Sequence, residues 1–93
     1  IMDRITNKHL EAMTNRLNEL VGAELEKWNK ETGKSNAGTY YVQGAYGGYR
    51  LERIANDGGG ASDISLRGTK REIYEQIRTA VTVLEFQNRR REY

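Results

Sequence analysis

The stretch YYVQGAYGGYRLERIANDGGGASDISLRGTKRE, residues 40–72, decides the fold of this chain. It holds most of the ten glycines and most of the six tyrosines, so short β-type runs alternate with glycine pairs and triplets. Glycine loses the most backbone freedom on folding, so a chain that concentrates it needs tight turns or a close backbone approach. The stretch is therefore expected to supply both a small sheet and the functional surface.

Two strands are predicted at residues 40–46 and 49–55, joined by Gly47-Gly48, because a glycine pair favours the primed turns of β-hairpins. Pairing Tyr46 with Tyr49 would set the register. One face would then carry the more apolar set and meet the helices: Tyr40, Val42, Gly44, Tyr46, Tyr49, Leu51, Arg53 and Ala55. The other face would carry Tyr41, Gln43, Ala45, Arg50, Glu52 and Ile54. A turn at residues 56–60 leads to a short third strand, residues 61–66.

Helices are predicted on either side of these strands in the sequence. Thr6 is a candidate N-cap for a helix whose apolar stripe recurs at three- and four-residue spacing: Leu10, Met13, Leu17, Leu20 and Val21. Thr69 to Glu72 matches a capping box, and the helix after it carries Ile73, Ile77, Ala80, Val81 and Leu84 on one face. Residues 30–38 are polar and indicate a loop. The expected fold is α+β, a two-layer α/β sandwich in the order α-β-β-β-α, with a small antiparallel sheet packed by two helices.

Length and composition indicate one small domain over residues 1–93, with residues 1–5 and 88–93 expected to fray. A domain of this size has a thin core, so assembly into a homo-oligomer is a plausible supplement. There is no cysteine, and no apolar run approaches the roughly 18 residues of a membrane span, so we expect a cytosolic protein without a membrane partner.

The charges nearly balance, with 15 basic and 13 acidic side chains, which is not typical of a non-specific duplex-DNA binder. Up to Tyr46 there are six basic and six acidic side chains. After Tyr46 there are nine basic and seven acidic side chains, and eight of the nine basic ones are arginine. Arginine suits bidentate recognition of phosphate and stacks on aromatic faces.

Catalytic motifs are weak. His9 is the one histidine and belongs to the first turn of a helix, no metal-ligand spacing is present, and Ser62 and Ser65 lack a base to activate them. We therefore expect a protein that is not an enzyme and uses no cofactor or metal.

The predicted binding site centres on residues 67–71, RGTKR, at the start of the second helix. A helix N-terminus offers backbone N–H groups and a partial positive charge to an anion, so Arg67, Thr69, Lys70 and Arg71 are candidate phosphate ligands. Tyr46 could stack on a base and Asn56 could bond its edge. The glycine run is longer than a turn needs, so Gly58, Gly59 and Gly60 are expected where backbone and ligand meet.

The runs GAYGGYRLERIANDGGGASDIS and RGTKREIYEQI resemble a group of small phage and prophage proteins, and within it the Thoeris anti-defence proteins of the first type. Those proteins bind and sequester cyclic ADP-ribose signals without degrading them. The resemblance spans roughly residues 38–84 plus the leading helix, and the segment between Asn56 and Arg67 is short here. It implies helices packed on an antiparallel sheet, a homo-oligomer with ligand near the subunit interface, and a place in the host cytoplasm.

Carried over by position, the resemblance makes Tyr46 the stacking aromatic, Asn56 the partner of the ligand's polar edge, and Arg67 and Arg71 the phosphate ligands. Two alternatives stay open. A single-stranded nucleic-acid binder would use Tyr41, Gln43 and Arg50 on the exposed sheet face together with the NRRREY tail. A protein inhibitor that docks on a host enzyme is the other.

Overall fold

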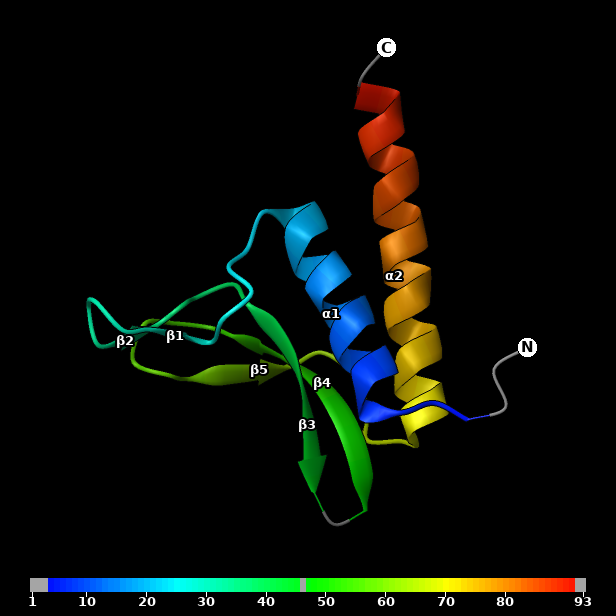
Figure 1. Cartoon of the computed structure of the whole chain (residues 1–93), viewed down its shortest axis with the longest axis horizontal. Coiled ribbons are helices and arrows are strands. Elements are labelled where there is room, and N and C mark those ends of the chain that lie inside the picture. Colours follow the sequence, from blue (N-terminus) through cyan, green and yellow to red (C-terminus); the bar gives the residue numbers. More distant parts are fainter. Residues whose placement is uncertain (1–3, 46, 92–93) are drawn as a thin grey trace.

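The computed structural model describes residues 4–45 and 47–91 and places two helices on one side of a small twisted sheet (Figure 1). The first helix, α1, spans Asn7–Val21 and begins at Thr6 as predicted. The Thr6 hydroxyl accepts from the His9 N–H at 3.3 Å, and His9 Nδ1 accepts from the Thr6 N–H at 3.0 Å. His9 therefore takes the return role that Glu or Gln has in the usual capping box. The helix ends at Gly22.

The second helix, α2, spans Lys70–Arg91, and the predicted capping box is confirmed at its start. Glu72 Oε1 accepts from the Thr69 N–H at 3.0 Å, and the Glu72 N–H donates to the Thr69 hydroxyl at 3.1 Å. The backbone hydrogen bond is the main reason that the pKa of Glu72 lies below its usual value. The helix continues through Arg91, so it takes in part of the segment that we expected to fray.

The main sheet is antiparallel in the order β3-β4-β5, with β3 at Tyr40–Ala45, β4 at Gly48–Ile54 and β5 at Ala61–Asp63. Gly44 pairs with Tyr49 and Ala45 with Gly48, so the predicted pairing of Tyr46 with Tyr49 is wrong by two residues. A shift of two keeps every side chain on its face. Tyr40, Val42, Tyr49 and Leu51 accordingly pack on the helices, as expected.

The third strand, β5, is shorter than the predicted residues 61–66. Beyond Asp63 the regular strand pairing with β4 ends. The Ile64 N–H donates to the Leu51 carbonyl, and the Ser65 hydroxyl accepts from the Leu51 N–H. The side chain of Ser65 therefore replaces a strand hydrogen bond at this point.

A small second sheet was not expected. Strands β1, Trp28–Asn29, and β2, Lys34–Ser35, form a hairpin inside a stretch predicted largely as loop, so the element order is α-β-β-β-β-β-α. The turn is closed by Asn29, whose Oδ1 accepts from the N–H groups of Glu31 and Thr32. In Figure 1 the hairpin projects from the end of the main sheet, away from α2.

The core lies between the helix layer and one face of the sheet, as the α+β two-layer prediction requires. Ile5 is only 6 % exposed and belongs to this core, although it falls in the segment expected to fray. The fully buried members are Ile73 and Ile77 of α2, joined by Leu10, Leu17, Leu51 and Val81. No helix in the described part of the chain has the length and apolarity that a membrane crossing requires.

A buried amide joins the helix layer to the edge of the sheet. The side chain of Asn18 is 1 % exposed, and its Nδ2 donates to the Tyr40 carbonyl at 3.0 Å. The Tyr40 N–H donates in turn to Asn18 Oδ1 at 2.8 Å. Asn18 thereby satisfies the two backbone groups of Tyr40 that a further strand would otherwise have to pair.

Candidate functional site

The tip of the β3–β4 hairpin is held against the start of α2. Tyr49 and Gly68 exchange two backbone hydrogen bonds, at 2.7 and 2.8 Å, and Arg67 Nη1 donates to the Gly48 carbonyl at 3.3 Å. Gly48 has φ +122°, and a Cβ atom there would lie 2.5 Å from the Gly68 carbonyl oxygen. Only glycine allows the two segments to come this close.

This contact creates a depression of about 690 Å³. Its wall is formed by the end of the hairpin (Gly47, Gly48 and Tyr49), the start of α2 (Gly68 to Glu72), and Arg4 and Ile5 ahead of α1. Of the predicted site residues, Thr69, Lys70 and Arg71 line it, and Arg67 lies beside it through its contact with Gly48. The structure thus brings the predicted anion-binding segment together with the hairpin tip.

Cations dominate the wall of this depression: Arg4, Lys70 and Arg71 are set against one carboxylate, that of Glu72. That carboxylate accepts the capping hydrogen bond from Thr69, which uses part of its acceptor capacity. The positive end of the α2 dipole adds to the cationic field at the same place. Arg71 is half-exposed, with its Nη1 3.9 Å from the Glu75 carboxylate, an interaction that solvent weakens.

Tyr49 and Arg4 were not predicted for this site. The Lys70 ammonium lies 5.5 Å from the centre of the Tyr49 ring, and the half-buried ring lines the depression. From the sequence Tyr49 was expected to pack in the core, which it also does. No local signal indicated its second role, because that role depends on the contact with Gly68.

The remaining predicted residues lie at the other end of β4. Asn56 Oδ1 accepts from the N–H groups of Gly58 and Gly60, at 3.0 and 3.1 Å. A Cβ atom on Gly60 would lie 2.6 Å from Asn56 Nδ2, and Gly59 has φ +93°. These hydrogen bonds and close approaches account for the glycine run as a turn that Asn56 closes with its own side chain.

The two groups of predicted residues are therefore apart within one chain. They are separated by the seven residues of β4, which at about 3.3 Å per residue span about 20 Å. Asn56 and Gly58–Gly60 stay predictions as ligand residues, and so do Arg67, Thr69, Lys70 and Arg71. Tyr46 lies outside the described residues.

A charged network covers the other face of the sheet. Glu52 is 4 % exposed and accepts from the Tyr41 hydroxyl at 2.7 Å and from Arg50 at 2.7 and 3.0 Å. Arg50 also contacts Asp63 at 3.4 Å and Gln43 at 3.3 Å. The hydrogen bond from Tyr41 is the main reason that the pKa of Glu52 is lowered, and burial is the main reason that the pKa of Tyr41 rises to about 12.

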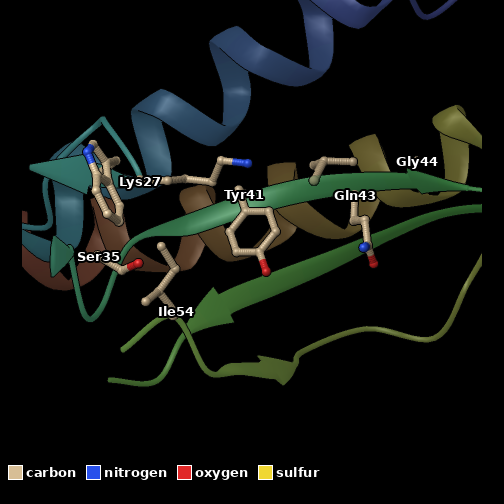
Figure 2. Close-up of a pocket in the computed structure, with 9 residues that line it drawn as sticks. Lys27, Ser35, Tyr41, Gln43, Gly44 and Ile54 are labelled. Atoms are coloured by element: carbon tan, nitrogen blue, oxygen red, sulfur yellow. The ribbon is translucent and has the colours of Figure 1, made fainter. Parts of the chain in front are cut away.

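Sequence reasoning missed this network because the predicted register did not place Tyr41 opposite Glu52. Beside it lies a second depression of about 590 Å³ between the β1–β2 hairpin and the sheet (Figure 2). There the Lys27 ammonium lies 4.8 Å from the centre of the Tyr41 ring, while Ser35, Gln43 and Ile54 form part of the lining. Gly59 also reaches this depression.

No protein-family model, curated protein or solved structure matches the chain. Within residues 4–45 and 47–91, no group of three or more His, Cys, Asp or Glu side chains is placed to hold a metal ion. The cationic depression at the start of α2, residues 68–72 with the hairpin tip, is the arrangement with the clearest chemical capacity, which is to bind an anion.

Proposed function

We propose that this protein is a phage counter-defence protein that binds a cyclic nucleotide signal of the cyclic ADP-ribose type and sequesters it in the host cytoplasm without converting it. The proposal rests on one observation, the convergence of Arg4, Lys70 and Arg71 at the N-terminus of a long helix. The resemblance of residues 38–84 to the Thoeris anti-defence proteins supplies the class of ligand.

The chemistry of such a ligand suits this depression. A pyrophosphate bridge carries two negative charges, and charge-assisted hydrogen bonds from guanidinium and ammonium groups are about twice as strong as neutral ones. The helix N-terminus adds its partial positive charge. Tyr49 offers an aromatic ring beside the cations, on which a purine could stack.

Sequestration demands tight binding. A Kd of about 10 nM corresponds to about −11 kcal/mol, which is more than two ion pairs in open solvent provide. In one chain the depression is open to water, so the proposal includes a homo-oligomer in which a second copy covers it. Excluding water would strengthen each charged hydrogen bond.

The nucleic-acid alternative is not favoured by the contacts on the sheet face. Arg50 is engaged by the carboxylates of Glu52 and Asp63, and the Tyr41 hydroxyl donates to Glu52. A nucleic-acid backbone laid on this face would meet two carboxylates that already engage Arg50, with the Lys27 ammonium beside the Tyr41 ring as a further cation. No contact in the described chain favours the protein-inhibitor alternative either.

Calorimetry with cyclic ADP-ribose tests the proposal, with native mass spectrometry against a panel of cyclic mono-, di- and trinucleotides to identify the preferred ligand and its stoichiometry. Each lost charge-assisted bond is worth about 1.5–3 kcal/mol, so Arg71→Ala and Lys70→Ala should each weaken binding about tenfold to a hundredfold. The recovered ligand should be chemically unchanged.

Arg16→Ala is the matched control, because Arg16 is a half-exposed arginine of α1 that approaches Glu19 and Glu85 and does not line the depression. It should leave the affinity unchanged. Wild-type protein that binds none of the panel, or an Arg71→Ala variant that binds as tightly as wild type, would refute the site. Oligonucleotide binding that falls steeply with salt would instead support the nucleic-acid alternative.

A further inference from the structure

Helix α2 has a second apolar stripe that nothing in the described chain covers. The helix has 22 residues against 15 in α1, and its C-terminal turns extend beyond the end of α1 (Figure 1). On the side opposite its core residues, uncharged positions recur at the spacing of one helix face: Thr79, Thr82, Val83 and Phe86. Val83 is 52 % exposed and Phe86 is 58 % exposed.

The two threonines present methyl groups on this stripe. The hydroxyl of Thr79 donates to the Glu75 carbonyl and that of Thr82 to the Arg78 carbonyl, each at 2.9 Å. Because both hydroxyls are satisfied within the helix, burying this face leaves no hydroxyl without a partner. The stripe from Thr79 to Phe86 can therefore be covered by an apolar partner.

The shape of the stripe indicates what kind of partner fits. A depression of about 190 Å³ is lined by Val83 together with four residues of one face, Glu75, Arg78, Thr79 and Thr82. These four residues have the i, i+3, i+4, i+7 spacing of the hole that receives one side chain of a facing helix. Phe86 lies one turn beyond the hole and is the large side chain that could fill such a hole.

We propose that a second copy of this chain docks on this face, with the two α2 helices antiparallel about a two-fold axis and Phe86 of each inserted in the hole of the other. In a two-fold interface each contact occurs twice, so one hole and one projecting side chain on the same helix are sufficient. The inference rests on the outer face of α2 and does not depend on the proposed ligand.

Charge supports the antiparallel arrangement. The register that places Phe86 in the hole sets Glu75 of one copy opposite Arg89 of the other. Arg89 is exposed, with its guanidinium 5.4 Å from the Phe86 ring, so it would enter the contact together with that ring. The present ion pairs of Glu75, with Arg71 at 3.9 Å and Arg78 at 4.0 Å, are long and exposed, so a new partner displaces little. A parallel arrangement would oppose like charges.

Light scattering after gel filtration and sedimentation equilibrium of the full chain over a dilution series test this assembly. Wild type without ligand should show a species of at least twice the 10.7 kDa chain. Phe86→Asp and Val83→Asp should each raise the dimer Kd at least tenfold while circular dichroism shows an unchanged helix content. Leu66→Asp, at an apolar side chain 87 % exposed elsewhere, is the control and should leave the Kd unchanged.

A charge exchange tests the register. Glu75→Arg and Arg89→Glu should each weaken the dimer alone, because each replaces an unlike pair by a like pair. An equimolar mixture of the two variants should recover it as a heterodimer that native mass spectrometry resolves by mass. A wild type that is monomeric throughout the dilution series, a Phe86→Asp variant with unchanged Kd, or a mixture that forms no heterodimer would overturn the proposal.

Discussion

Asn18→Ala tests the connection between the helix layer and the sheet. The buried Asn18 amide makes two hydrogen bonds to the backbone of Tyr40, one in each direction, at 3.0 and 2.8 Å. Alanine removes both partners at once and leaves an N–H and a carbonyl of β3 without a hydrogen bond. The apolar packing of α1 against α2 is left in place, so the loss reports on these two bonds.

The magnitude follows from the burial of the site. A buried polar group left without a partner costs about 1–3 kcal/mol, and water can reach this sheet edge in part, so the two groups together should cost about 2–4 kcal/mol. Alanine recovers about 0.5 kcal/mol through its higher helix propensity. The expected net loss of about 2–3 kcal/mol corresponds to a fall in Tm of about 10–20 °C for a domain of this size.

Urea denaturation followed by circular dichroism and by Trp28 fluorescence measures the change in free energy of unfolding. Asn15→Ala, at a half-buried asparagine on the same helix, is the matched control and should change stability by no more than about 0.5 kcal/mol. If Asn18→Ala lowered the free energy of unfolding no more than Asn15→Ala does, the Asn18 amide would not join the helix layer to the sheet, which would refute the prediction.

Further changes address the hairpin tip and the charged network. Gly48→Ala should lose about 2–4 kcal/mol of stability, because its Cβ would meet the Gly68 carbonyl oxygen at 2.5 Å in addition to the strain of φ +122°. The control Gly33→Ala, at φ +70° in open space, should lose about 1–2 kcal/mol. Equal losses of stability in the two variants would contradict the close approach of Gly48 to Gly68. The lowered pKa of Glu52 predicts a free energy of unfolding that falls as the pH drops below 4.5, since the unfolded chain takes up the proton first, and Glu52→Gln should flatten this acid limb. The raised pKa of Tyr41 predicts a second fall as the pH rises from 10 towards 12, where the unfolded chain ionises first, and Tyr41→Phe should reduce it; denaturation curves over pH that run parallel to wild type would contradict both.

Local motifs in the sequence predicted the helix starts correctly, because a capping box is complete within four residues. Thr69 and Glu72 bond to each other in the predicted way, and Thr6 caps α1. The faces of the sheet were also predicted, since alternation along a strand survives a register shift of two. The fold class follows from the helix starts and from the alternation of side chains along the strands.

Contacts between distant segments explain what the sequence did not predict. Gly48 belongs to β4 rather than to the turn, where its backbone lies against Gly68, twenty positions further along the chain. The burial of Asn18 and Glu52 likewise depends on partners on another element, and neither position differs in type from a polar surface residue. The β1–β2 hairpin has too few residues to show any periodicity.

Only the part of the candidate site that depends on local sequence was predicted. Thr69, Lys70 and Arg71 were proposed from a helix N-terminus, which is a local feature, and they do line one depression. Asn56 and the glycine run were grouped with them from proximity in sequence, but β4 carries the chain away from the hairpin tip before the turn at Asn56 begins. Sequence distance does not give the direction in which a strand runs.

The two hydrogen bonds between Tyr49 and Gly68 also determine where this protein can change in length. They hold the two ends of the segment from Tyr49 to Gly68 together, so that this segment forms a closed loop. Closure entropy grows only with the logarithm of length, about 0.6 kcal/mol for each doubling, so residues inserted at the exposed Gly58 would cost little. The turn at Asn56 to Gly60 could thus lengthen at the cost of the hydrogen bonds that Asn56 makes within it, while the hairpin tip and the start of α2 keep their spacing.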